Sequence, residues 1–350
     1  MQSRQVLFPL AARLALMMWA VTLVGLLSGV LSARVWPQRD LLAYFVYMPA
    51  SGPVLNVMDM SHGLTWLMAR GVNDLQPMRW SPDGTLIAYV VFGDPGGMHI
   101  HVVDVFTGEN RALTTGTSAN FAPEWSPDGS HIAFVSNRDG VNEIYVMAAD
   151  GSDQRNVTNQ PAHFDDQGVW SPDGTHLIFQ SHRGGRANFY QMTADGELVG
   201  PLAAISFDTV PYWSPDGNVM LLSAAGRLYH LDAAGGQPQP ISADIGAHAR
   251  GWSPDGSQIV YIAAPDDSTR ELYRARADGS DPRRLTVNQL AEIHASWSAD
   301  GRYIAYDGQA GRTYASYVID AHDGTVIMRL RFRAKTPVWQ PPLPTALTAR

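Results

Sequence analysis

The chain has 350 residues, of which 45% are hydrophobic and 17% are charged, so it can bury a sizeable core and does not have a disordered composition. Its formal net charge of −8 excludes the basic balance that is typical of a nucleic-acid-binding protein, and we expect no nucleic-acid partner. The absence of cysteine excludes disulfide bonds, thiolate catalysis and cysteine metal sites.

The first predicted element is a transmembrane helix over residues 14–33, after a short N-terminal segment, residues 1–13. This stretch carries no charge, and as a helix it would be about 30 Å long, enough to cross the hydrocarbon core of a bilayer. Arg4 and Arg13 favour a cytoplasmic N-terminus. We therefore predict a retained signal-anchor and a linker at residues 34–40, with the rest of the chain on the extracytoplasmic side of the cell membrane. A cleaved signal peptide, which would leave a secreted or periplasmic protein, is the alternative.

A five-residue motif, Trp-Ser-Pro-Asp-Gly, then returns along the chain at intervals of 39 to 45 residues. Five copies are complete, and a sixth reads Trp-Ser-Ala-Asp-Gly at Trp297–Gly301. A period of about 40–45 residues is the length of one four-stranded propeller blade. The motif therefore predicts stacked blades that begin around Trp80, Trp125, Trp170, Trp213, Trp252 and Trp297.

Each repeat contains the same series of short β-type segments. An apolar triplet such as Ile132-Ala133-Phe134 follows each tryptophan, without the polar alternation of a half-exposed strand. Ser-Pro-Asp-Gly is typical of a tight turn, because proline presets φ and glycine accepts a positive φ. We interpret the motif as the hairpin between the first and second strands of a blade, with the tryptophan ring filling the wedge between blades. The aspartates of the complete copies are turn residues in this interpretation, with no catalytic role.

Two incomplete units at the ends of the predicted propeller indicate how the ring closes. Residues 40–69 read as three strands of a blade that lacks its first strand, and Lys335–Pro341 holds a tryptophan, Trp339, with no strand after it. We predict an all-β, seven-bladed propeller over residues 41–340, whose seventh blade combines the Trp339 strand with the three N-terminal strands. Trp36 could instead supply a local first strand. Residues 341–350 are predicted to be a disordered tail.

The segment Asn142–Phe179 resembles the repeat of TolB-type, WD-repeat-like β-propellers, and the resemblance extends over roughly residues 40–340. TolB itself has an α/β domain before six blades and is a soluble periplasmic protein of the Tol–Pal system. The expected seven blades and membrane anchor imply that this chain is not TolB proper. Similar propellers precede the hydrolase domain of prolyl-oligopeptidase-type peptidases and form the body of oligogalacturonate lyases, so the resemblance implies a fold more than a function.

Residues with catalytic potential are few. No Gly-x-Ser-x-Gly nucleophile motif occurs. His163, His248 and His294 lie in segments that lead into first strands, so the alternative function is a metal-dependent lyase or hydrolase that acts on a carbohydrate or small ester in the central channel. Their unequal offsets from the motif tryptophans argue against convergence, and we predict no metal and no cofactor.

The preferred function is a non-catalytic scaffold that binds a protein, peptide or other ligand of the cell envelope. Its binding face should combine the loops between blades with the loops that join second to third strands, because function is concentrated in loops held by a stiff scaffold. Acidic, arginine and aromatic side chains on these loops suit a protein or peptide partner. The candidate binding residues are Asp74, Phe121, His163, Phe164, Asp165, Asp166, Phe207, Asp208, His248, Glu292, His294, Arg138, Arg183, Arg186 and Arg312.

Overall fold

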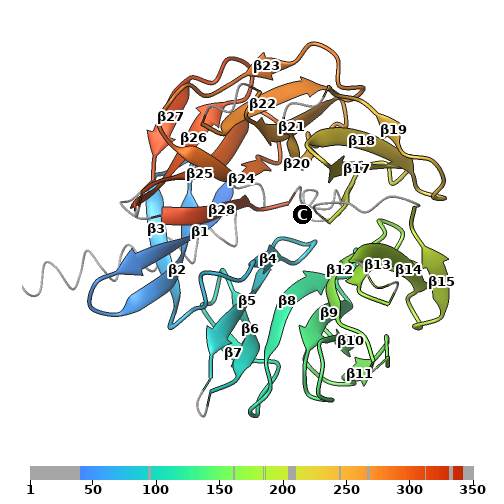
Figure 1. Ribbon diagram of the computed structural model, residues 1–350. Helices are drawn as coiled ribbons and strands as arrows, with labels where there is room; N and C mark the ends of the chain where they lie inside the picture. The colour runs from blue at the N-terminus through green and yellow to red at the C-terminus, as the bar shows by residue number, and fades with distance from the viewer. Residues whose placement is uncertain are drawn as a thin grey trace, which may run out of the picture. The chain divides into compact units, whose positions relative to one another are not determined.

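The computed structural model describes residues 40–93, 96–160, 162–183, 185, 187–203, 210–243, 246–265, 269–311, 313–330 and 334–341. Within these residues the regular structure is all β, arranged as seven four-stranded antiparallel sheets that follow one another around a ring (Figure 1). The described part of the chain contains no helix that is long and apolar enough to cross a membrane. The predicted transmembrane segment, Trp36 and the predicted tail beyond residue 341 lie outside the described residues.

Each sheet is one blade, numbered here in ring order from the blade that holds both ends of the propeller. The first strands are β28 (Ala334–Trp339), β4 (Arg79–Trp80), β8 (Asn120–Trp125), β12 (Asp165–Trp170), β16 (Tyr212–Trp213), β20 (His248–Trp252) and β24 (Ala291–Trp297). The second strands are β1 (Leu41–Met48), β5 (Leu86–Phe92), β9 (His131–Ser136), β13 (His176–Ser181), β17 (Val219–Ala224), β21 (Gln258–Ala263) and β25 (Tyr303–Ala310).

The third and fourth strands complete the blades towards the outside of the ring. The third strands are β2 (Gly52–Asp59), β6 (Met98–Asp104), β10 (Glu143–Ala148), β14 (Asn188–Thr193), β18 (Arg227–Asp232), β22 (Glu271–Arg276) and β26 (Thr313–Asp320). The fourth strands are β3 (Leu64–Arg70), β7 (Asn110–Ala112), β11 (Arg155–Asn156), β15 (Leu198–Pro201), β19 (Gln239–Pro240), β23 (Arg283–Arg284) and β27 (Val326–Arg329).

The ring closes as predicted, through the Trp339 strand. Strand β28 pairs antiparallel with β1, with Leu42 opposite Trp339, and Figure 1 shows β28 beside β1. The Gln340 backbone N–H donates to the Leu41 carbonyl at 2.9 Å, the same bond that Ser81 makes with Leu86 in the complete motif. The Gln340 side chain also donates to the Gly84 carbonyl of blade 2 at 2.7 Å. Blade 1 therefore takes its first strand from β28.

The core is divided into seven apolar clusters, each formed between two neighbouring blades. Alternate side chains of one strand supply two clusters. In β1, Ala43 and Phe45 pack against blade 2, whereas Leu42 and Tyr44 pack against blade 7. All four side chains are fully buried. This explains the apolar triplets of the sequence, because a strand covered on both faces has no solvent-facing positions.

The repeated tryptophan also links the blades by a hydrogen bond. In four of the seven blades its indole N–H donates to the backbone carbonyl of the residue that precedes the tryptophan of the previous blade. The tryptophan therefore fills the wedge between blades, as predicted, and in these blades it also joins neighbouring blades by a hydrogen bond. The hydrogen-bonded pairs are Trp80 with Val338 (3.1 Å), Trp125 with Arg79 (3.2 Å), Trp170 with Glu124 (3.3 Å) and Trp252 with Tyr212 (2.9 Å).

The Ser-Pro-Asp-Gly segment forms the predicted hairpin turn. In blade 3 the Ser126 hydroxyl donates to the Asp128 carboxylate at 2.6 Å, the same carboxylate accepts the Ser130 backbone N–H at 3.0 Å, and Gly129 has a φ of 72°. The hydrogen bonds from Ser126 and Ser130 lower the pKa of Asp128 to about 2. In the other copies of the motif the serine hydroxyl likewise donates to the aspartate, which is Asp83, Asp173, Asp216, Asp255 or Asp300. The motif aspartates therefore hold turns, as predicted.

Candidate functional site

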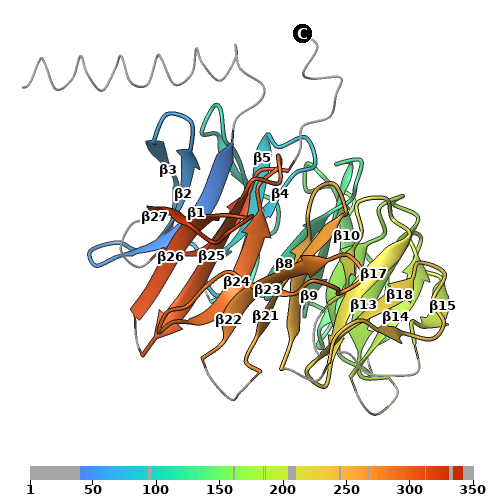
Figure 2. The same cartoon turned by 90° about the horizontal axis from the view of Figure 1, so that it is seen from above.

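The strands run between two loop-bearing faces, and Figure 2 shows the blades from the direction perpendicular to Figure 1. We call motif face the one with the Trp-Ser-Pro-Asp-Gly hairpins and the turns between third and fourth strands. We call interblade face the opposite one, which carries the loops between blades and the loops that join second to third strands. Because each blade is an antiparallel meander, this assignment follows from the strand order.

Exposed large apolar side chains are distributed unequally between the faces. Half of those in the described residues lie on the interblade face, in its loops or at the strand ends that border them, and the others lie on fourth strands, three of them at the strand end that borders the motif face. The described turns of the motif face carry none. Leu75 is 78% exposed, Phe92 is 64% exposed and Val287 is 82% exposed. The interblade set is Tyr47, Met48, Leu75, Phe92, Phe164 and Val287, and the fourth-strand set is Leu64, Leu67, Leu198, Val199, Val326 and Ile327.

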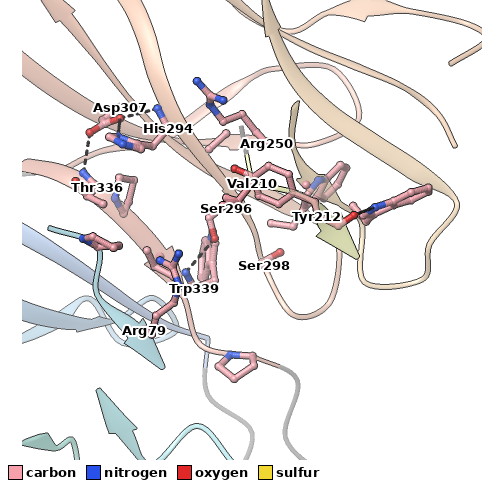
Figure 3. A pocket seen from close by; sticks show the side chains of 18 of the residues that line it. Arg79, Val210, Tyr212, Arg250, His294, Ser296, Ser298, Asp307, Thr336 and Trp339 are labelled. Carbon is pink, nitrogen blue, oxygen red and sulfur yellow. Dashed lines mark hydrogen bonds and ion pairs between the residues drawn. The ribbon is translucent and has the colours of Figure 1, made fainter. Parts of the chain in front are cut away.

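A cavity of about 820 Å³ occupies the centre of the ring, and residues of all seven first strands line it (Figure 3). The residue directly before the motif tryptophan lines it in every blade, because side chains alternate along the first strand and this position points away from the wedge. These residues are Arg79, Glu124, Val169, Tyr212, Gly251, Ser296 and Val338.

Three ion pairs in this cavity join different strands and loops. Arg79 Nε lies 2.5 Å from Glu124 Oε2, and the Arg79 pKa is raised by this carboxylate. Lys335 Nζ lies 2.7 Å from Asp74 Oδ2, and both side chains are mostly buried. The third pair joins the half-exposed His294, through Nδ1, to Asp307 Oδ1 at 3.0 Å.

Asp307 is fully buried and holds more than the histidine ring. Its two oxygens also accept the backbone N–H groups of His294 at 3.0 Å and Thr336 at 2.7 Å, as the dashed lines of Figure 3 show in part. Held by these three contacts, the Asp307 carboxylate orients the His294 imidazole in the cavity. Among the described cavity residues, this His–Asp pair is the one best suited to proton transfer.

Arg250 is a cation of the cavity whose charge is not balanced by an acidic side chain among the described residues. Its Nε donates to the Ile293 carbonyl at 2.7 Å and its Nη1 donates to the Ala249 carbonyl at 2.7 Å, and the Tyr212 side chain lies near its guanidinium. No carboxylate of the described residues lies within ion-pair distance of it. Burial lowers the pKa of Arg250, Tyr212 and Asp307 oppose this effect, and the nearby Arg270 adds to it.

Of the predicted binding residues, Asp74 and His294 line the cavity. Phe164 is 56% exposed on the interblade face, and Phe121 packs between the clusters of blades 2 to 4. His163 and His248 are half-buried and do not line the cavity. Asp166 is half-buried beside the buried Asp165, and desolvation raises the pKa of Asp166. Phe207, Asp208, Arg186 and Arg312 lie outside the described residues.

Two of the predicted arginines bind within their own blades. In blade 4, Arg183 Nη2 lies 3.1 Å from the fully buried Asp165, and its Nε donates to Ser181 Oγ at 2.8 Å. In blade 3, Arg138 likewise donates to Asn120 at 2.9 Å and to Ser136 at 2.9 Å. Both guanidinium groups also stack on aromatic rings of the second and third strands. The arginine of a shared Ser-x-Arg sequence thus donates to a buried polar side chain five positions before the motif tryptophan.

Blade 7 has an acid at this position and no arginine. Glu292 is fully buried opposite Gly308, and the arginine position is occupied by Ala310. Its Oε1 accepts a bond from the Asn288 side chain at 2.8 Å, and its buried Oε2 has no partner among the described residues. Burial, reinforced by the nearby Glu271 carboxylate, raises the pKa of Glu292 to about 7. Its carboxyl group is therefore enclosed by the blade.

Sequence reasoning missed Arg79, Glu124, Arg250, Asp307 and Lys335, which carry most of the charge of the cavity. A signal existed for the first two, because they directly precede motif tryptophans in strands whose side chains alternate. No local signal marks Asp307, which sits in the apolar triplet region of a second strand.

The fold and the repeat can now be compared with known proteins. Residues 42–225, more than half of the chain, match the TolB beta propeller domain family. The chain belongs to the TolB β-propeller family. Among curated relatives, an uncharacterized protein of Agrobacterium fabrum is 33% identical over 119 residues, which cover 33% of this chain and 40% of that protein. The Tol-Pal system protein TolB of Desulfosudis oleivorans is 38% identical over 50 residues, 14% of this chain and 11% of that protein.

The chain thus spans less than half the length of these curated relatives. Solved structures show the same fold. TolB from Acinetobacter baumannii matches with a TM-score of 0.55 and 22% identity, covering 86% of this chain and 67% of that one. A puromycin-hydrolyzing peptidase of Mycobacterium tuberculosis matches with a TM-score of 0.64 and 14% identity, covering 84% of this chain and 53% of that one. TolB-family propellers and peptidase propellers therefore share this architecture.

Proposed function

We propose that the propeller is a non-catalytic scaffold that binds a protein or peptide partner of the cell envelope through its interblade face. The observation that carries the proposal is the distribution of exposed apolar side chains among the loops, since the loops of this face hold Leu75, Phe164 and Val287 whereas the described turns of the motif face hold none. Exposed apolar side chains grouped on one face are typical of interaction surfaces. Family membership supports a place in the envelope, because one relative is named for the Tol–Pal system.

The proposal includes attachment to the cell membrane through residues 14–33, with the propeller on the extracytoplasmic side. The support is the uncharged length of this segment and the arginines before it. Release into the periplasm after cleavage is the other arrangement compatible with the same partner. Fractionation of cells that produce the protein separates them, because a retained helix leaves the full-length chain in the membrane fraction after a high-salt wash.

Site-directed photo-crosslinking in cells tests the scaffold proposal. A photo-reactive amino acid is placed at Leu75 or Phe164 on the interblade face, and at Asp195, an exposed turn residue on the motif face, as the matched control. We expect a discrete cross-linked partner from the first two positions and none from the third. Equal cross-linking from Asp195, or no product from Leu75 and Phe164, would contradict the proposal.

A second candidate is an enzyme that acts on a carbohydrate or small ester in the central cavity, and the observation that favours it is the Asp307–His294 pair. The described residues contain no group of three metal-ligating side chains, so they do not supply a ligand set for a metal-dependent mechanism. Hydrolysis of a small chromogenic ester tests the candidate. Activity that is lost in His294→Gln and kept in His62→Gln would support an enzyme, because His62 forms a matched 3.0 Å pair with Asp59 outside the cavity. Equal rates in both variants would exclude His294 from catalysis of this reaction.

A further inference from the structure

The charges of the central cavity are unevenly matched. Arg79 is paired with Glu124, and Lys335 is paired with Asp74. The remaining carboxylate, Asp307, is occupied by His294 and by the Thr336 backbone. In the part of the cavity that the structure describes, each acid thus has a partner within hydrogen-bond distance, whereas Arg250 has backbone carbonyls and a tyrosine in place of an acid.

The Arg250 side chain is nevertheless held in place. Its hydrogen bonds to the Ile293 and Ala249 carbonyls bridge β24 and β20, and the Tyr212 side chain of β16 lies nearby. A guanidinium carries five N–H donors, so these two hydrogen bonds leave three for a ligand. A cation fixed by neutral acceptors keeps its full charge and pays little side-chain entropy when an anion binds. Figure 3 shows Arg250 near Tyr212 and His294, with no interaction drawn to Asp307.

We propose that the central cavity is a carboxylate-binding site in which Arg250 forms the ion pair with the ligand. The cavity volume of about 820 Å³ falls within the range of about 300–1,000 Å³ that is usual for small-ligand sites. The hydroxyl of Tyr212 and the half-exposed ring of His294 supply further polar contacts beside the guanidinium. Planar guanidinium groups match carboxylates well, because two parallel N–H donors can meet two oxygens.

A carboxylate fits this cavity better than a phosphate dianion. Arg250 is the one cavity cation of the described residues without an acidic partner, so it can balance one negative charge of a ligand, whereas a second negative charge would find only cations that already pair with Glu124 and Asp74. The carboxylate can come from the C-terminus of a peptide or from an acidic sugar, since both present the same planar group. The site does not depend on the proposed partner at the interblade face, and it can be tested in its absence.

Binding measurements on the full-length purified protein test the proposal. Ligand-detected NMR compares N-acetylglycylglycine with its C-terminal amide, and methyl glucuronide with methyl glucoside, with inorganic phosphate as a further probe. We expect at least one of the two acids to bind about ten-fold or more tightly than its neutral analogue and more tightly than phosphate. The acid that binds identifies the source of the carboxylate. Binding of neither acid, equal binding of acid and neutral analogue, or tighter binding of phosphate overturns the proposal.

Substitution then assigns the site. Arg250→Met should weaken the binding of the acid by roughly 10- to 100-fold, which is the range expected for the loss of a charge-assisted hydrogen bond. Arg111→Met is the matched control, because Arg111 also donates to two backbone carbonyls, those of Asp150 and Ala149, but lies outside the cavity. Unchanged affinity in Arg250→Met, or an equal loss in Arg111→Met, contradicts the assignment. If Arg250→Met does not fold, Arg250→Lys keeps the cation without the planar fork and should lose part of the affinity; no loss counts against the proposal.

Discussion

The buried Glu292 predicts an unusual dependence of stability on pH. Its pKa is raised from an ordinary value of 4.5 to about 7, because the carboxyl group is desolvated and lies near Glu271. Below pH 4.5 the folded and unfolded states both carry the proton. Between pH 4.5 and 7 the unfolded chain releases the proton and the folded chain keeps it, so the free energy of unfolding falls as pH rises. Above pH 7 both states are ionised, and the penalty is complete.

The size of this effect follows from the shift. A pKa raised from 4.5 to about 7 corresponds to a loss of about 3 kcal/mol in the free energy of unfolding between pH 4 and pH 8. The environment leaves little to reduce it, since the Glu292 side chain is fully buried and accepts a hydrogen bond from the neutral Asn288 side chain. The charged groups that face it are Glu271 and, beyond that acid, Arg284, which lies 2.8 Å from Glu271 and is partly exposed.

Glu292→Gln removes the titration while keeping the shape of the protonated acid. Urea unfolding followed by tryptophan fluorescence at several pH values measures the result. We expect the variant to match the unsubstituted protein near pH 4 and to be about 3 kcal/mol more stable at pH 8. Parallel stability profiles from pH 4 to pH 8, or a variant that is less stable at pH 8, would refute the reasoning.

Asp165→Asn is the matched control, because Asp165 occupies the same strand position and has the arginine that blade 7 lacks. Here the same acid-to-amide change should destabilise the protein at pH 8 by about 1.5–3 kcal/mol, since it leaves the Arg183 guanidinium without its charged partner. The two substitutions should thus change the free energy of unfolding at pH 8 in opposite directions, although they lie at the same position of the blade. A change in the same direction would show that the arginine does not decide the effect.

Three further predictions concern the architecture. Truncation after Arg331 removes β28, and we expect loss of the cooperative thermal transition because blade 1 loses its first strand; an unchanged melting temperature would contradict the closure. Trp125→Phe removes an interblade hydrogen bond and should lower the free energy of unfolding by about 1 kcal/mol more than Trp297→Phe, because the buried indole N–H of Trp297 has no partner among the described residues. Chemical denaturation measures the difference, and a larger loss in Trp297→Phe would contradict a stabilising role of the interblade hydrogen bond. Asp128→Ala should lower the free energy of unfolding by about 1 kcal/mol near neutral pH. The difference in stability between the variant and the unsubstituted protein should narrow as pH falls from 4 towards 2, because Asp128 becomes protonated in this range. A difference that stays constant over this range would show that the charge of Asp128 is not involved.

Much of the fold could be predicted because a propeller repeats local information. The turn, the apolar triplet and the tryptophan recur in each unit, so their period predicts blades before any contact is known. The unmatched Trp339 strand also predicted the closure, since a first strand without a second must pair with strands that lack a first. Even the missing arginine of blade 7 is visible on inspection, as Gly308 and Ala310 replace the Ser-x-Arg of blades 3 and 4.

The site was less predictable because it is assembled across blades. Arg79 meets Glu124 from the next blade, Lys335 near the C-terminal end of the propeller meets Asp74 near its start, and Arg250 bonds to the backbone of the blade that follows. The sequence by itself determined the blade, because its contacts are local and repeated. Only the tertiary structure decided which side chains share the cavity and which cation lacks an acid, because those contacts depend on how seven similar units are placed around one axis.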